Sequence, residues 1–203
     1  CCIRYADLSN VEELQQSAFL DCQFLETVRG GAKTIGDNCF QRCISLRSAD
    51  FPQLAEIGVS SFEDAGKMKL KAPLLQQVKD SFYHSKIRAV FLDQLTEIRE
   101  FAFQNLGQLE FCRFNQLKLV RAREFAGCSL LKWFVAPQLQ VVEDGAFLGC
   151  LKLQLIKIKV QTIKCRVGRK NVVRRVGENR GVWEKMRKVW QLMREIGIML
   201  SEE

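Results

Sequence analysis

The chain is nearly without histidine, has few prolines and contains no long apolar run. His84 is the only histidine among 203 residues, so chemistry that needs an imidazole would rest on one side chain. Three prolines and 13 glycines are too few for a disordered, low-complexity chain. No uncharged apolar stretch approaches the roughly 18 residues that a membrane-spanning helix needs. What remains is a globular chain, 47% hydrophobic, that can bury a large core.

The short motifs that mark common active sites are also missing. The sequence has no GxSxG, P-loop, GxGxxG or HExxH motif. A Cys–His nucleophile pair would need His84 beside a thiolate, and no spacing places one there. We interpret His84 as a surface residue of a turn. We therefore predict a protein that is not an enzyme and needs no cofactor.

The net charge of +8 is unevenly distributed. Residues 1–160 hold 20 Lys/Arg and 18 Asp/Glu, whereas residues 161–203 hold 11 Lys/Arg and 5 Asp/Glu. The main body is therefore almost neutral, and the C-terminal part is basic. Because a nucleic-acid-binding body would need a basic face, no nucleic-acid partner is expected.

A phenylalanine recurs every 20 to 22 residues along most of the chain. The recurring positions are Phe19, Phe40, Phe62, Phe82, Phe103, Phe125 and Phe147. An aliphatic residue lies five positions before six of them, and a small or apolar residue lies three positions after each. In-phase copies of this kind predict a repeat protein, whose units bury their apolar edges against one another.

Each repeat reads as a short strand followed by a return made of turns. Apolar and polar residues alternate with period two just after Leu46 and Leu131, which indicates a strand. Pro52 and Pro137 follow these two strands, and proline ends a strand because it has no N–H to donate. The residues that remain in each repeat are too few for a long helix.

Two stretches, TIGDNCFQRC (Thr34 to Cys43) and VVEDGAFLGC (Val141 to Cys150), carry a family resemblance. The pattern resembles the BspA-like type of leucine-rich repeat. The resemblance implies a curved α/β-type solenoid, with a short-stranded parallel sheet on its concave face and mostly loops and turns on its convex side. It assigns about seven units of 19–22 residues to residues 1–163. It also implies binding of other macromolecules, and some relatives are cell-surface proteins.

Six of the nine cysteines occupy repeat positions that other units fill with Ala, Ser, Leu or Val. They are Cys22, Cys39, Cys43, Cys112, Cys128 and Cys150. We interpret them as small buried hydrophobic residues, because no CxxC…CxxC spacing suggests a metal site. Such thiols favour the cytoplasm. A cell-surface or secreted location stays open, because the opening CCIRYADLSN lacks a start methionine and a signal peptide and looks incomplete.

Strand alternation predicts two rows of side chains that point out from the concave face. The first row is Tyr5, Thr27, Ser48, Lys69, Ala89, Phe111, Trp133 and Leu155. The second row is Asp7, Arg29, Asp50, Lys71, Phe91, Arg113, Val135 and Lys157. Aromatic anchors with a polar rim are typical of protein interfaces. The predicted partner-binding residues are therefore Phe91, Phe111, Arg113, Trp133, Val135, Leu155 and Lys157, with Ser48 and Asp50 in the polar half.

Two other interpretations of the aromatic cluster stay open. The C-terminal part of the chain could fold back and cover these side chains. Alternatively, a register error of one residue would turn them inward, because successive side chains of a strand alternate between its faces.

The repeat fades after residue 163. Residues 164–181 form a basic irregular segment, and residues 182–200 have the apolar spacing of an amphipathic helix. Its apolar stripe contains Val182, Met186, Val189, Met193, Ile196 and Leu200, with Trp183 and Trp190 beside it. The helix could cap the solenoid, dock on a partner such as a calmodulin-like receptor, or lie on a membrane surface. Membrane contact is expected only through this segment.

These observations lead to one main hypothesis and two alternatives. The main hypothesis is a non-enzymatic scaffold that binds a protein partner, of unknown identity, through its concave face. The first alternative is a cell-surface BspA-like adhesin for host or matrix proteins. The second is a regulatory subunit that docks through its basic C-terminal helix.

Overall fold

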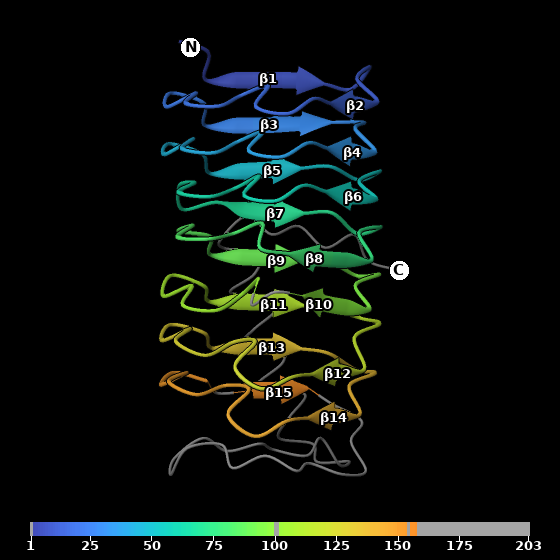
Figure 1. Cartoon of the computed structure of the whole chain (residues 1–203), viewed down its shortest axis with the longest axis vertical. Helices are drawn as coiled ribbons and strands as arrows, with labels where there is room; N and C mark the ends of the chain where they lie inside the picture. The colour runs from blue at the N-terminus through green and yellow to red at the C-terminus, as the bar shows by residue number, and fades with distance from the viewer. Residues whose placement is uncertain (1, 100–101, 154, 158–203) are drawn as a thin grey trace, which may run out of the picture.

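The computed structural model describes residues 2–99, 102–153 and 155–157. Along these residues the backbone winds into a stack of turns made of parallel strands, as Figure 1 shows. No helix occurs in this part of the chain, which agrees with the few residues available between strands. The segments predicted at 164–181 and 182–200 lie outside the described residues.

One parallel sheet of eight strands, which we call the main sheet, runs the length of the stack. Its strands are β1 (Tyr5–Leu8), β3 (Thr27–Gly30), β5 (Ser48–Asp50), β7 (Lys69–Lys71), β9 (Ala89–Phe91), β11 (Phe111–Arg113), β13 (Trp133–Val135) and β15 (Leu155–Lys157). Each strand pairs with the equivalent strand of the next turn. The period-two segments of the sequence predicted these strands, and the three prolines follow β5, β7 and β13 as expected.

Seven strands of two or three residues form a second line that the sequence did not reveal. They are β2 (Glu13–Leu14), β4 (Thr34–Ile35), β6 (Glu56–Ile57), β8 (Gln77–Lys79), β10 (Glu97–Arg99), β12 (Leu119–Val120) and β14 (Val141–Val142). They make one three-stranded sheet, β2-β4-β6, and the pairs β8–β10 and β12–β14. The line breaks between β6 and β8 and again between β10 and β12. The first break lies next to the shortest step of the main sheet, where Lys69 pairs with Ala89.

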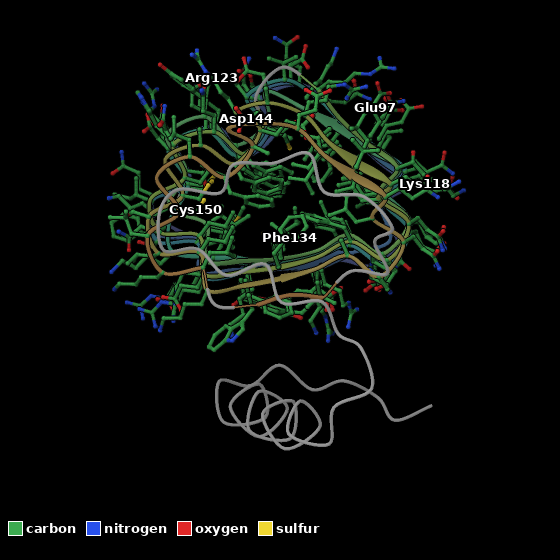
Figure 2. The ribbon with its side chains drawn as sticks, turned by 90° about the horizontal axis from the view of Figure 1, so that it is seen from below. Glu97, Lys118, Arg123, Phe134, Asp144 and Cys150 are labelled. Atoms are coloured by element: carbon green, nitrogen blue, oxygen red, sulfur yellow. The ribbon has the colours of Figure 1, made fainter. Side chains whose placement is uncertain are left out.

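The recurring phenylalanines form a column of stacked rings along the core. Successive ring centroids lie 5.2 to 6.0 Å apart from Phe19 to Phe147. Phe134, from β13, adds its ring edge-on to Phe125 and Phe147, each at 5.0 Å. Figure 2, a view along the stack, shows Phe134 in the interior and Arg123 on the outside.

The backbone turns on either side of each phenylalanine through left-handed conformations. Two residues after the phenylalanine, φ is positive at Asp21, Arg42, Asp64, His84, Asn105, Gly127 and Gly149. Two residues before it, φ is positive at Ser17, Asn38, Ser60, Asp80, Arg123 and Gly145. His84 is therefore a turn residue, and it is exposed as predicted.

The six repeat-position cysteines are buried, which confirms their interpretation as small core residues. The thiols of Cys43, Cys128 and Cys150 also donate to backbone carbonyl oxygens of the preceding turns, at 3.0 to 3.2 Å. Burial raises the pKa of the Cys39 and Cys43 thiols to about 12. At neutral pH these thiols are protonated and are weak nucleophiles.

Candidate interaction face

The side of the main sheet that points away from the phenylalanine column is the face that the sequence analysis named concave; we call it the outer face. Its two predicted rows are aligned by the strand pairing, for example Phe111 with Ala89 and Trp133. Between these rows, Val90 and Cys112 are fully buried in the main core. Phe91 and Phe111 belong to a separate cluster. A one-residue register error is therefore excluded.

The half of the outer face that β1 to β7 form is polar and open. Arg29 contacts Asp7 at 2.6 Å, and Lys71 lies 3.8 Å from Asp50. Tyr5 is 51% exposed at the end of this half, under the guanidinium of Arg29. The hydrogen bond from the Ser9 hydroxyl, followed by that from Arg29, lowers the pKa of Asp7 to about 2.

Ser48 and Asp50, the two predicted contact residues of the polar half, stand next to each other on β5. Both are half-buried. Ser48 pairs with Thr27 and Lys69, and Asp50 pairs with Arg29 and Lys71. The sequence placed both residues correctly on the outer face.

The other half carries an apolar patch, formed by Ala89, Phe91, Phe111, Trp133 and Val135. The rings of Phe91 and Phe111 are in contact, with centroids 5.1 Å apart. Where β11 pairs with β13, Phe111 lies beside Trp133 and Arg113 lies beside Val135. All four are predicted contact residues. On β15, Leu155 pairs with Trp133 and Lys157 pairs with Val135, so the backbone continues both rows. The structure describes only the backbone of these two residues.

The apolar patch is buried rather than open. Ala89, Phe91 and Phe111 are 4%, 3% and 5% exposed, although they point away from the main core. Trp133 and Val135 are half-buried. The sequence predicted the position of these side chains but not their burial, because strand alternation carries no information about tertiary contacts.

Ion pairs between successive turns border the patch on both sides. Arg113 makes two bonds of 2.7 Å with the carboxylate of Asp93, which also accepts a bond from the Asn115 amide at 3.0 Å. The Arg113 guanidinium lies 5.2 Å from the centroid of the Phe91 ring.

On the opposite border, Arg88 bonds the Glu110 carboxylate at 3.1 Å, and Lys132 lies over the ring of Trp133. Sequence analysis found Arg113 but missed these partners. Opposite charges spaced by one repeat, as in Asp93 and Arg113, were the available signal.

No other kind of site stands out in the described ranges. Within them, no group of three or more His, Cys, Asp or Glu side chains is arranged to hold a metal ion. The same residues include no helix of the length and hydropathy required to cross a bilayer. The outer face is therefore the candidate site that the fold presents.

The described residues thus form a repeat protein of the solenoid class, with parallel strands and one phenylalanine in the core of each turn. The family model described as the BspA type leucine rich repeat region matches residues 1–69 and 76–167 in six copies, and the chain belongs to this family. The break in the match falls on residues 70–75, within the short step between β7 and β9. Proteins with such repeats typically serve protein interaction or are found at cell surfaces, and the fold is typically non-enzymatic.

Several solved structures are similar to this chain, among them the following two. The T. pallidum leucine-rich repeat protein TpLRR superposes with a TM-score of 0.58 and 22% identity, over 74% of this chain and 78% of that one. A leucine-rich repeat protein from Eubacterium ventriosum gives a TM-score of 0.52 and 13% identity, over 78% of this chain and 61% of that one. At these identities the likeness concerns the fold alone. Among curated proteins, none matches.

Proposed function

We propose that this protein is a non-enzymatic interaction scaffold that binds a protein partner through the outer face of its main sheet. The observation that carries the proposal is the division of two aligned rows into a polar half and an apolar half. The core holds the backbone of both halves in place through the stacked rings behind it. A partner therefore meets a surface that is already ordered, which reduces the entropic cost of binding.

The side chains of the outer face suit a folded protein partner. The polar half mixes both charges, with Asp7 and Asp50 beside Arg29 and Lys71. Such a pattern selects a complementary charged surface and disfavours a uniformly anionic ligand such as nucleic acid. From the apolar half, the half-buried Trp133 adds an aromatic side chain, the type that contributes most to protein interfaces.

Site-specific photo-crosslinking tests the proposal. A photo-reactive amino acid is placed at Ser48 of the full chain, which is then illuminated in an extract of the cells that produce the protein. We expect a defined crosslinked protein whose yield falls when excess unmodified chain competes. Reversal of the neighbouring charge by Asp50→Lys should reduce the same product.

Glu56 provides the matched control, because it is exposed on β6 in the same turn but belongs to the second line of strands. The photo-reactive group at Glu56 should give no such product. The reversal Glu56→Lys should leave the product formed from Ser48 unchanged. Equal crosslinking from both positions, or none from Ser48, would overturn the proposal.

A further inference from the structure

We propose that Glu124 and Arg121 form a proton-controlled latch at the step between β10 and β12. The latch breaks the hydrogen-bonded line of short strands at this step when Glu124 is ionised and restores it when Glu124 is protonated. The coupling between two neighbouring turns therefore depends on pH. This inference concerns one step of the fold and does not rest on the proposed function.

Three other steps of the second line show which bond is missing at this one. In them, the residue after a short strand donates its N–H to a carbonyl oxygen of the preceding turn. These bonds run from Gly36 to Leu14, from Gly58 to Ile35 and from Glu143 to Val120, at 2.7 to 2.9 Å. Arg121 follows β12 in the same way. Ile98 holds the repeat position of Leu14 and Ile35, so the corresponding bond would join the Arg121 N–H to the Ile98 carbonyl.

Both groups of that bond have other partners. The Arg121 N–H donates to Oε2 of Glu124 at 2.8 Å. The Ile98 carbonyl accepts a bond of 3.1 Å from Nη1 of the Arg121 side chain. β10 and β12 belong to separate sheets, although they lie in consecutive turns, as Figure 1 shows. Glu124 thus captures the donor of the line, and the side chain of Arg121 satisfies the acceptor that is left.

The charge of Glu124 supports both replacement bonds. A hydrogen bond to an ionised acceptor is about twice as strong as one between neutral groups, so a carboxylate competes well with a backbone carbonyl. Nη1 of Arg121 also lies 3.5 Å from Oε1 of Glu124, which helps to hold the guanidinium near Ile98. Protonation weakens both contacts. The Ile98 carbonyl has a second lone pair, with which it can then accept the Arg121 N–H.

The charged groups around Glu124, among the described residues, come from three turns. Arg121 belongs to the same turn, and its Nη2 lies 3.6 Å from the carboxylate of Glu97 on β10. Glu97 is also paired with Arg99, and Glu143 comes from the next turn. Burial raises the pKa of Glu124 to about 7, with a further increase from Glu143 and against the lowering effect of Arg121. The latch is therefore expected to change state near neutral pH.

The main sheet crosses the same step without a break. Phe111 pairs with Ala89 there, and Arg113 pairs with Phe91. Opening and closing of the latch therefore change the bonding of the two turns on one side only, while the outer face keeps its register.

Nuclear magnetic resonance couplings across hydrogen bonds measure the latch directly in the full chain. Such a coupling joins the amide nitrogen of the donor to the carbonyl carbon of its acceptor. Between Arg121 and Ile98 we expect no coupling at pH 8 and a coupling at pH 5, because the N–H moves from the carboxylate to the carbonyl. The coupling between Glu143 and Val120 should be present at both pH values and is the internal reference.

Two substitutions separate the side chain of Glu124 from its charge. Glu124→Ala installs the residue of equivalent turns, as at Ala102 and Ala146, and should give the coupling between Arg121 and Ile98 at both pH values. Glu124→Gln cannot titrate, so its spectra at pH 5 and pH 8 should agree at this bond. The matched control is Glu56→Gln, on an exposed side chain of β6, which should keep the pH dependence of the unmodified protein.

Three results would overturn the latch. A coupling between Arg121 and Ile98 that is present at pH 8, or absent at pH 5, in the unmodified protein would show that protonation does not control this bond. Its absence in Glu124→Ala, with the reference coupling intact, would show that the line is broken for another reason. A pH dependence that persists in Glu124→Gln would assign the change to another titrating group.

Discussion

Glu124 is a carboxylate buried in a repeat position where other turns hold alanine, as at Ala18, Ala102 and Ala146. It is 4% exposed and accepts a bond of 2.8 Å from the backbone N–H of Arg121. Burial raises the pKa of Glu124 to about 7, against the lowering effect of Arg121. The charged form is therefore disfavoured by folding, and this turn carries a cost that the alanine turns do not.

The pKa of Glu124 predicts how stability depends on pH. Between the ordinary pKa of 4.5 and the folded value of about 7, the native state binds more protons at this site than the unfolded state does. The contribution of Glu124 to the free energy of unfolding therefore falls as pH rises through this window. The lowered pKa of Asp7 acts only at lower pH.

We expect Glu124→Gln to unfold at a higher urea concentration than the unmodified protein at pH 8 and to lose this advantage at pH 5. Urea titrations at the two pH values measure the difference, and Glu56→Gln, on an exposed side chain of β6, is the control. A difference that does not change with pH would show that Glu124 titrates in its ordinary range.

His84 belongs to the left-handed turn column, with φ of 52°. A left-handed conformation costs about 1–2 kcal/mol for a residue with a Cβ, and glycine removes this cost but loses more entropy on folding. We expect His84→Gly to raise the free energy of unfolding by about 0.5–1 kcal/mol, measured by urea denaturation.

Two alanine substitutions at the equivalent positions of other turns test whether the positive φ is the cause. Gly149→Ala should be destabilising through backbone strain alone, since its Cβ would find ordinary contacts. Gly127→Ala should be worse, because its Cβ would collide with Oδ1 of Asn105. A destabilised His84→Gly variant would show that the stacking of the His84 ring on Tyr83 outweighs the strain.

The phenylalanine column dominates at the scale of the elements. Phe125 lies at its most crowded point, with the rings of Phe103, Phe114, Phe134 and Phe147 all within 6.0 Å between centroids. Truncation of a fully buried phenylalanine removes transfer free energy and leaves a cavity. We expect Phe125→Ala to lower the free energy of unfolding by about 3–5 kcal/mol.

Phe24 is the matched control for this prediction, because it is 58% exposed. Phe24→Ala should change the free energy of unfolding by no more than about 0.5 kcal/mol. Urea denaturation followed by circular dichroism measures both variants. A small loss in Phe125→Ala would mean that the column relaxes around the missing ring.

The sequence predicted the elements that repeat in residue type and missed those that repeat only in geometry. The main strands and the phenylalanine column were predictable because apolar residues mark them in every turn. The second line was missed because five of its seven strands have only two residues, as in Glu13–Leu14, which is too few to show an alternation. The left-handed columns were missed because Asp, Arg, His, Asn and Gly all occupy them.

The outer face shows the same limit. Period two fixed the direction of Phe91 and Phe111, because a strand offers only two faces. It could not fix their exposure, since strand alternation carries no information about tertiary contacts. The bidentate ion pair of Arg113 and Asp93 is an intermediate case. It could be predicted from the sequence only after the repeat length was known.

The whole molecule is a stack in which each turn is bonded to the turns next to it. Main-sheet pairing connects consecutive repeats only, from β1–β3 to β13–β15. The turn hydrogen bonds follow the same rule, as from the N–H of Gly127 to the carbonyl of Leu148. The stability of such an array is approximately a sum of turn and neighbour contributions.

This connectivity predicts that damage to one turn stays local. In native-state hydrogen exchange, Phe125→Ala should increase exchange of amides in the turns around β11 and β13, because their ring contacts are lost. Amides of β1, β3 and β5 should keep the protection of the unmodified protein, since several intact turns separate them from the cavity. A uniform increase along residues 2–153 would instead show that the stack unfolds as one cooperative unit, with interface terms between turns that exceed the stability of any single turn.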